Sequence, residues 1–280
     1  MKTALALGTF DGVHPGHRAV LDLPDGYKKI AVVFSVPPKS VISGEPLAIM
    51  TSEDKTRALK RIGMDKVCSL EFRDVRDMTP EDFLLFLKKR FSPSFISCGF
   101  NYRFGKNAEG DTALLRDFCL KNKIELKVNE PVMKNGVAVS STEIRELLKN
   151  GEIQKANALL AEPFSFSASV IRGDERGRTL GFPTANQKYP KTLIPVKFGV
   201  YKTAVIIGEK KYDGITDIGV RPTFRTDYII SETFIKDFRG NLYGRKITVQ
   251  LLEFLRGEKI FSSTEELKRQ IQSDMRSAGI

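Results

Sequence analysis

The stretch Gly8-Thr9-Phe10-Asp11-Gly12-Val13-His14-Pro15-Gly16-His17 follows the apolar run Ala4–Leu7 and contains both histidines of the chain. This order predicts a strand, a glycine-rich turn and the start of a helix. Such a turn aims backbone N–H groups and two imidazoles at one point, which suits the phosphates of a nucleotide. Two histidines in a surface turn are the alternative interpretation. The three glycines and the absence of any other histidine favour the phosphate site.

Length and composition indicate a globular protein. The 280 residues, 41% of them apolar, suffice for one large or two medium domains. No run approaches the roughly 20 apolar residues that span a bilayer, and the N-terminus lacks a signal-peptide cleavage pattern. We therefore expect a cytoplasmic protein with no membrane contact. Cys68, Cys98 and Cys119 lack ligand spacing, which predicts reduced, mostly buried thiols rather than disulfides or a zinc site.

The net charge of +11 favours phosphorylated partners of some kind. A basic surface attracts nucleic acids and phosphorylated metabolites alike, so the charge alone does not decide between them. The chain has no RNA-recognition signature and no ladder of stacking aromatics. We expect small-molecule partners and no nucleic acid. The sequence does not determine the oligomeric state, and a monomer is compatible with it.

Residues 1–160 alternate short β-branched runs with helical stretches. Strands are predicted at Lys29–Phe34, Lys66–Leu70 and Phe95–Cys98, and helices at Ser52–Ile62, Pro80–Phe91 and Asp111–Asn122. This alternation predicts an α/β domain with a Rossmann-like parallel sheet. Ligands bind such sheets at the carboxyl ends of the strands.

The pattern changes near Ala161-Glu162-Pro163. Later strands are separated by glycine turns instead of helices, as in Phe164–Ile171, Tyr201–Ile207, Thr233–Phe238 and Lys246–Phe254. Period-two runs with short turns predict an antiparallel β-barrel over residues 161–280. The chain ends in a predicted helix, Thr264–Ser277, whose start fits a capping box.

The histidine stretch resembles the HxGH signature of the nucleotidyltransferase superfamily. Its longer form, GTFDGVHPGH, is most similar to the version in prokaryotic bifunctional riboflavin kinase/FAD synthetases. The resemblance implies an FMN adenylyltransferase domain over residues 1–160, in which the two histidines stabilise charge during catalysis. It also implies an ATP site that includes Gly8, Phe10, His14 and His17.

Val139-Ser140-Ser141-Thr142-Glu143-Ile144-Arg145 resembles the SSTxIR motif of the same family. From the residues alone, Ser140 and Glu143 predict a capping box that opens a helix ending at Gly151. The helix N-terminus is also suited to a triphosphate, and the two interpretations are compatible. The resemblance adds four residues to the ATP site: Ser140, Ser141, Thr142 and Arg145.

The segment from Cys98 to Asp111 resembles the G-x-[DN]-[FY]-x-F-G element of the family, which implies that Asn101 and Phe104 bind the flavin. A glycine-bounded loop after a strand is the simpler interpretation. One departure stands out. The family usually has Phe-Asp/Glu-Pro-His-Pro where this chain has Phe34-Ser35-Val36-Pro37-Pro38, so an acidic residue and a histidine are missing.

The segment Gly173–Asn186 resembles the riboflavin kinase signature G-x-[GR]-x-G-R-x-[LI]-G-[FY]-P-T-A-N. A basic loop followed by a proline turn explains its glycines but not the Pro-Thr-Ala-Asn that follows. The resemblance implies that Thr184 and Asn186 bind Mg²⁺, a cation that prefers oxygen ligands. It implies that the remaining ATP contacts come from Gly173, Arg176, Gly177, Arg178 and Gly181.

Phosphorylating a hydroxyl also requires a proton acceptor, and many carboxylates could serve. The motif E-[TAV]-H-[IL]-x-[DN]-F reads Glu232-Thr233-Phe234-Ile235-Lys236-Asp237-Phe238 here, so the resemblance implies that Glu232 is the base. Phe234 replaces the usual histidine. Asp217, within Thr216–Thr223, replaces the usual asparagine.

The resemblance implies a bifunctional enzyme of flavin biosynthesis. ATP and Mg²⁺ would support phosphorylation of riboflavin to FMN in the barrel. A second ATP would adenylate FMN to FAD in the first domain, with release of pyrophosphate. One alternative is a transferase that acts on another phosphorylated acceptor and carries an accessory barrel. The other is a flavin- or RNA-binding regulator without enzymatic activity.

Overall fold

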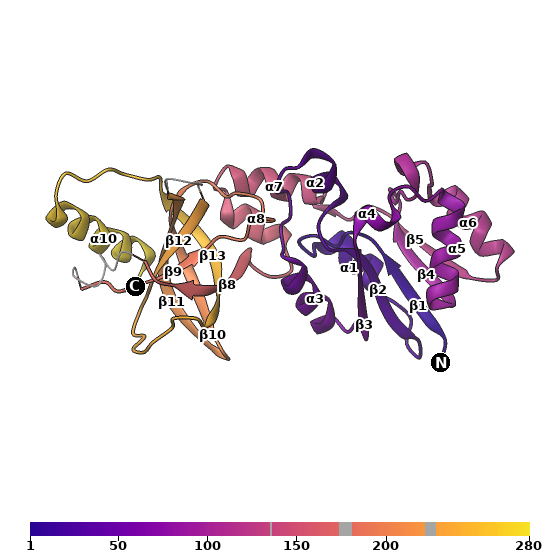
Figure 1. Cartoon of the computed structure of the whole chain (residues 1–280), viewed down its shortest axis with the longest axis horizontal. Helices are drawn as coiled ribbons and strands as arrows, with labels where there is room; N and C mark the ends of the chain where they lie inside the picture. The colour runs from indigo at the N-terminus through magenta and orange to yellow at the C-terminus, as the bar shows by residue number, and fades with distance from the viewer. Residues whose placement is uncertain (135, 174–180, 222–227) are drawn as a thin grey trace. The chain divides into compact units, whose positions relative to one another are not determined.

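The computed structural model describes residues 1–134, 136–173, 181–221 and 228–280. The chain divides into two compact units, coloured from indigo to magenta and from pink to yellow in Figure 1. Unit 1 comprises Met1–Glu143 and Leu159–Ala161, and unit 2 comprises Ile144–Ala158 and Glu162–Ile280. The predicted domain division at residue 160 stays a prediction.

Unit 1 contains a parallel sheet of five strands in the order β3-β2-β1-β4-β5. The strands are β1 Thr3–Leu7, β2 Lys28–Phe34, β3 Lys66–Leu70, β4 Pro93–Gly99 and β5 Glu125–Asn129. This arrangement confirms the α/β prediction. The chain order reverses between β1 and β4, so a crevice is expected at the carboxyl end of β1.

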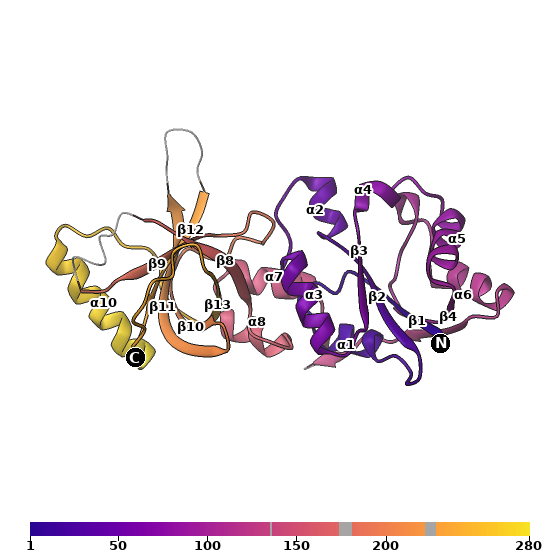
Figure 2. The same ribbon diagram turned by 60° about the horizontal axis from the view of Figure 1, so that its bottom comes forward.

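Helices cover both faces of this sheet. The α-helices between the strands of the sheet are α1 Pro15–Leu21, α2 Pro38–Ser43, α3 Ser52–Arg61, α4 Phe72–Val75, α5 Pro80–Phe91 and α6 Thr112–Lys121. Alternation along β1 separates two cores: Leu5 and Leu7 pack with α5 and α6, whereas Ala4 and Ala6 pack with α1 and α3. Figure 2 shows α3 on one side of the sheet and α5 and α6 on the other.

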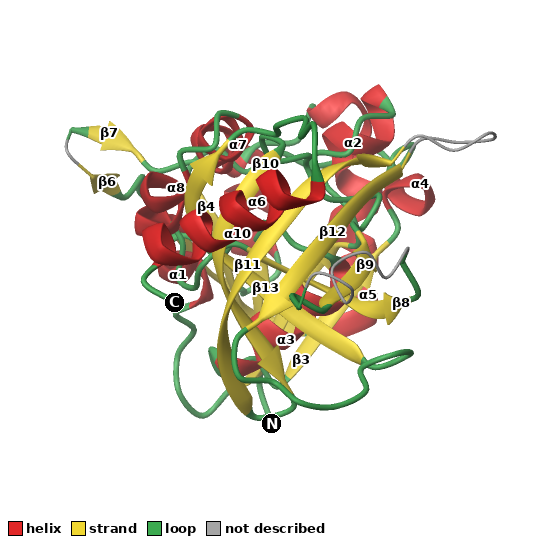
Figure 3. Ribbon diagram, turned by 90° about the vertical axis from the view of Figure 1, so that its left-hand side faces the viewer, coloured by secondary structure: helices red, strands yellow, loops and turns green. Residues whose placement is uncertain are grey.

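Unit 2 contains a closed antiparallel barrel in the order β10-β11-β12-β9-β8-β13, which confirms the second fold prediction. Its strands are β8 Ser165–Ile171, β9 Thr184–Lys188, β10 Gly199–Ile207, β11 Lys210–Arg221, β12 Tyr228–Ile235 and β13 Lys246–Arg256. The C-terminal helix α10, Thr264–Ala278, begins at the predicted cap, where Ser263 accepts from the Glu266 N–H. Figure 3 shows α10 crossing the outside of the barrel.

Two further helices lie between sheet and barrel in the sequence. Helix α7 spans Ser141–Lys149 and α8 spans Ile153–Leu159. Asn157 on α8 donates to the Leu251 carbonyl and accepts from the Phe164 N–H, both at 2.8 Å, so α8 is fastened to the barrel strands. A short hairpin, β6 Met133–Lys134 with β7 Val137–Ala138, precedes α7.

The three cysteines are free and buried, as predicted. Burial raises the pKa of Cys98 to about 12 and that of Cys119 to about 11, so both stay protonated thiols at neutral pH. In the described parts of the chain, no helix is long and apolar enough to cross a membrane, and no group of acidic, histidine and cysteine side chains could hold a metal ion.

Candidate functional site

The glycine-rich stretch forms a strained loop at the carboxyl end of β1. Phe10, Gly12 and Val13 have positive φ angles of 45°, 87° and 30°. The fully buried Asp11 holds this shape, because its carboxylate accepts from the Ile49 N–H at 2.9 and 3.0 Å and from the Met50 N–H at 3.1 Å. Sequence reasoning did not identify Asp11 as a residue of interest. Its partners lie 38 and 39 residues away, and no local pattern reveals them.

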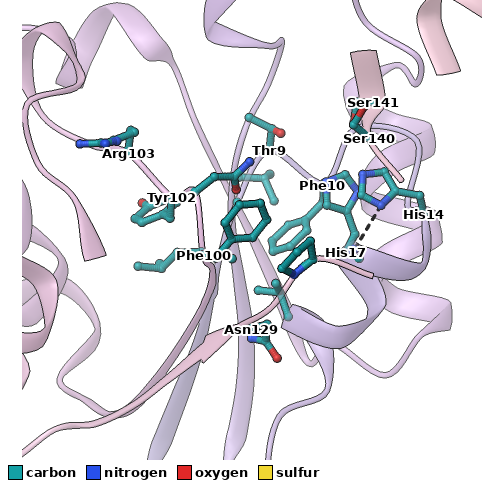
Figure 4. A pocket seen from close by; sticks show the side chains of 18 of the residues that line it. Thr9, Phe10, His14, His17, Phe100, Tyr102, Arg103, Asn129, Ser140 and Ser141 are labelled. Atoms are coloured by element: carbon teal, nitrogen blue, oxygen red, sulfur yellow. Dashed lines mark hydrogen bonds between the residues drawn. The ribbon is translucent and has the colours of Figure 1, made fainter. Parts of the chain in front are cut away.

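The two histidines stack at the start of α1. Their ring centroids are 3.7 Å apart with planes inclined by 21°, and Phe10 meets His17 edge-on. His14 is the N-cap residue, and its Nδ1 accepts from the His17 N–H at 3.4 Å. A neutral His14 therefore carries its proton on Nε2. Figure 4 shows both imidazoles beside Phe10 at one end of a cavity.

The second predicted phosphate-binding element, Val139–Arg145, contacts the glycine-rich loop. Ser140 caps α7 by accepting from the Glu143 N–H at 3.2 Å, as the capping box predicts. Ser141 donates from its hydroxyl to the Asp11 carbonyl at 2.8 Å, across 130 residues of sequence. Arg145 lies one turn further along α7 and does not line the cavity.

The cavity has a volume of about 400 Å³ and lies where the sheet topology predicts it. Its walls come from the carboxyl ends of the five strands and from the start of α7. The predicted residues that line it are Gly8, Phe10, His14, His17, Asn101, Ser140, Ser141 and Thr142. Phe104 lies behind the wall instead: it is buried, and its ring stacks on Tyr102 and Phe83 at 5.6 and 5.9 Å.

Several further residues line the cavity. Phe100, Tyr102 and Arg103 are among them, and Figure 4 shows Tyr102 and Arg103 on the side of the cavity away from the histidines. Desolvation raises the pKa of the Tyr102 phenol, so it stays protonated. Asn129 ends β5, where its side-chain amide donates to the Ser97 hydroxyl at 2.9 Å. The charged sequence of β5 did not predict a strand, so its end could not be placed.

Unit 2 has its own cavity, of about 630 Å³, beside β9. Thr184, Asn186 and Gly173 line it, together with residues 238–243 that follow β12. A Cβ on Gly173 would lie 2.5 Å from the Asn186 amide nitrogen, so only glycine permits this close approach. The side-chain oxygen of Asn186 is buried and has no hydrogen-bond partner among the described residues. A buried carbonyl oxygen without a donor suits a hard cation, so these residues fit Mg²⁺.

Strand register brings Glu232 next to Asn186. Glu232 on β12 lies directly opposite Asn186 on β9 and, on its other side, opposite Asp217 on β11. The Asp217 side chain is exposed, but the protein around its carboxylate withdraws it in part from water and raises its pKa to about 6. The neighbouring carboxylates Glu258, Glu232 and Asp274 add to the rise, while Arg256 opposes it.

Other predicted kinase residues are placed differently or not described. Glu232 and Gly181 do not line the cavity of unit 2. Gly181 has a φ angle of 84° in the left-handed region that favours glycine. Arg176, Gly177 and Arg178 lie outside the described residues.

Comparison with known proteins assigns each unit. A family model described as FAD synthetase matches residues 1–143, and one described as riboflavin kinase matches residues 160–279. The chain is 36% identical to the bifunctional riboflavin kinase/FMN adenylyltransferase of Escherichia coli K12 over 281 residues, which cover 96% of this chain and 90% of the relative. The protein of the same name from Bacillus subtilis is 31% identical over 290 residues, covering 99% and 92% of the two chains.

A solved structure has the same fold. A crystal structure named as a macrolide-efflux protein from Streptococcus pneumoniae matches with a TM-score of 0.85 and 28% identity, over 99% of this chain and 94% of that one. The sequence relatives span nearly the whole chain, and the two family models match in the order expected from the motifs. The chain therefore belongs to the family of bifunctional riboflavin kinase/FMN adenylyltransferases.

Proposed function

We propose that this protein makes FAD from riboflavin in two ATP-dependent steps, each at its own site. One observation carries the proposal: each unit has a cavity of its own, lined by its own nucleotide motif. The sheet cavity has the paired histidines and the start of α7. The barrel cavity has Thr184 and Asn186.

In the adenylyl transfer, a phosphate oxygen of FMN attacks the α-phosphorus of ATP and pyrophosphate leaves. The protein mainly positions the reactants and neutralises developing charge. Imidazole N–H groups of His14 and His17 donate to the phosphate oxygens of the transition state, since their stacked rings face the cavity together. Gly8 and Phe10 shape the loop that supports them. Ser140, Ser141, Thr142 and Arg145 are assigned to the triphosphate.

The flavin of FMN is assigned to the side of the cavity away from the histidines. Phe100 and Tyr102 both line the cavity and offer aromatic faces to the ring system. The amide of Asn101 supplies donors and an acceptor for the polar ring edge. Phe104 acts indirectly, because it stacks on Tyr102 from behind. This arrangement favours FMN over acceptors without an aromatic ring.

In the kinase step, the 5′-oxygen of riboflavin forms a bond to the γ-phosphorus of ATP while ADP leaves. Glu232 accepts the proton of that hydroxyl. Thr184 and Asn186 would hold Mg²⁺, which, when bound, neutralises charge on the transferred phosphoryl group. From the family motif, Gly173, Arg176, Gly177, Arg178 and Gly181 are assigned to ATP.

Product analysis tests this function. Purified protein is incubated with ATP and MgCl₂ and either riboflavin or FMN, and the flavins are separated by chromatography. We expect FMN and then FAD from riboflavin, FAD and pyrophosphate from FMN, and loss of FMN formation when EDTA removes Mg²⁺. Absence of both products would refute the proposal. Salt-sensitive RNA binding without turnover would favour the regulator instead. A monomeric state, a cytoplasmic location and the absence of a nucleic-acid partner stay predictions.

A further inference from the structure

The outer face of the barrel carries a row of residues that pair across neighbouring strands. Asn186 pairs with Glu232, Glu232 with Asp217, Asp217 with Val200, and Val200 with Arg256. Residues directly opposite each other in antiparallel strands share a face, with Cβ atoms about 4.5–5.5 Å apart. Glu232 and Asp217 are therefore side-chain neighbours on the face next to Asn186.

The residues on either side of Glu232 and Asp217 in this row are covered. Asn186 is buried beneath Gly173, and Val200 packs in one hydrophobic cluster with Ala278 of α10. Between these residues, Glu232 and Asp217 are exposed. The two adjacent carboxylates thus lie in the row between Asn186, which lines the barrel cavity, and Val200, which packs with the C-terminal helix.

Arg256, which lies opposite Val200 in this row, is engaged by another carboxylate. Arg256 donates to both carboxylate oxygens of Asp274 at 2.8–3.1 Å. Among the described residues, no ion pair joins Asp217 to a lysine or arginine. Glu258 closes the same side, since its carboxylate lies 2.2 Å from where a Cβ on Gly219 would be. Carboxylate oxygens accept hydrogen bonds, so two adjacent carboxylates suit a ligand that offers several hydroxyl donors.

The substrate assigned to this site, riboflavin, carries a neutral polyol chain. Riboflavin carries three further ribityl hydroxyls next to the one that is phosphorylated. A carboxylate accepts hydrogen bonds on both oxygens, whereas the asparagine usual in the family offers one acceptor and a donor. With the 5′-hydroxyl on Glu232, a neighbouring ribityl hydroxyl falls within reach of the next strand.

We propose that Asp217 is a specificity-determining residue of the kinase site, whose carboxylate accepts a hydrogen bond from a ribityl hydroxyl beside the one that Glu232 deprotonates. This inference rests on the proposed kinase function of Glu232. The contact orients the 5′-oxygen toward ATP. It therefore favours flavins with a hydroxylated side chain over flavins with only a terminal hydroxyl.

The test compares two substrates on the full-length protein: riboflavin, and a flavin whose ribityl chain is replaced by a 5-hydroxypentyl chain. Kinase kcat/KM is measured for the wild type, Asp217→Asn, Asp217→Ala and Asp213→Asn. Asp213 is an exposed aspartate on the same strand and face, about 13 Å away, and serves as the matched control.

We expect Asp217→Ala to lower kcat/KM for riboflavin by about 10- to 100-fold, the usual effect of losing a hydrogen bond to a charged group. Turnover of the hydroxypentyl flavin should stay unchanged, which also shows that the barrel is folded. Asp217→Asn should fall between wild type and Asp217→Ala, and Asp213→Asn should match the wild type.

Equal losses on both flavins, or no loss on riboflavin, would overturn the inference. Failure of the proposed function gives a different result. If Glu232 is not the base, Glu232→Gln turns over both flavins normally. The role of Asp217 is decided separately, by the ratio of kcat/KM for riboflavin to kcat/KM for the hydroxypentyl flavin.

Discussion

The two sites are built in different ways. The sheet site is assembled from segments far apart in sequence, and hydrogen bonds to the backbone fasten them, as between Asp11 and Ile49 and between Ser141 and Asp11. The barrel site is laid out by strand register. Asn186, Glu232 and Asp217 occupy matched positions on three neighbouring strands, and two of them are exposed.

This difference determines how each site fails. A strained loop depends on the few groups that hold it, so a change at a buried holding residue should alter both shape and rate. A sheet holds its side chains by many backbone hydrogen bonds, so replacing one exposed side chain should change chemistry and leave positions intact. A substitution at a holding residue in unit 1 should therefore change activity and stability together. A substitution of an exposed side chain in the barrel site should change activity with little effect on stability.

The largest effect is expected for Glu232→Gln. The glutamine keeps the size of the side chain and removes the proton-accepting carboxylate. General-base catalysis typically contributes about 10²–10⁴-fold, so FMN formation should fall by that order while riboflavin binding and adenylation of supplied FMN persist. Initial rates with each flavin check this, with Glu209→Gln in the exposed β10–β11 turn as the control. Near-normal FMN formation would direct the search for the base to Asp217.

The next largest effect is expected for His14→Ala and His17→Ala. Removing one donor that stabilises transition-state charge typically costs about 10²–10³ in rate. FAD formation should fall by that order, and FMN made from riboflavin should accumulate at the wild-type rate. The kinase activity of the same molecule serves as the control. Unchanged adenylation in both variants would contradict the role of the histidines.

Asp11→Asn tests the holding residue of the strained loop. Oδ1 of the buried carboxylate accepts from the Ile49 and Met50 N–H groups, and Oδ2 accepts from the Ile49 N–H as well. In the asparagine, an NH₂ donor in place of Oδ2 would face the Ile49 N–H donor and stay unsatisfied. A buried unsatisfied group costs about 1–3 kcal/mol, so unit 1 should unfold at lower denaturant concentration and adenylation should weaken. Kinase turnover should persist. A variant with full adenylation and unchanged unfolding would show that the loop does not need this anchor.

The smallest effect is expected on the stability of the barrel in Asp217→Asn. The pKa of Asp217 is raised from 3.8 to about 6 in the folded state, so its ionised form opposes folding at neutral pH. Asp217→Asn should therefore melt at a higher temperature than the wild type at pH 7.5. The gain should shrink as pH falls through 6 and vanish below pH 4. Melting curves at both ends of this range check the sign, and a gain that persists in acid would rule out this cause.

Local signals predicted much of the fold. Strand β3 and helix α5 have the predicted bounds, because Thr79 caps α5 and Pro80 occupies its first turn. Strands β9 and β11 were not predicted, since the polar residues of β9 read as part of a loop motif. The predicted strand Thr233–Phe238 differs from β12, Tyr228–Ile235, because Asp237 has a φ angle of 57° that ends the extended chain.

Because only local signals can be read from a sequence, some residues of the two sites could be predicted and others could not. Contiguous motifs contain His14, His17 and Thr184, and they could be identified directly. The anchoring of the loop by Asp11 and the contribution of Asn129 depend on how distant segments fold together. The pairing of Asp217 with Glu232 depends on strand register, which a change of one residue would abolish. Such relations need the three-dimensional structure.

The central claim is that two independent sites in one chain carry out successive reactions, and a mixing experiment tests it most directly. Full-length His17→Ala and Glu232→Gln are each given riboflavin, ATP and MgCl₂, separately and together. We expect only FMN from the first, no new flavin from the second, and FAD after a lag from the mixture, because FMN released by one variant is adenylated by the other. A mixture that forms no FAD would contradict the claim.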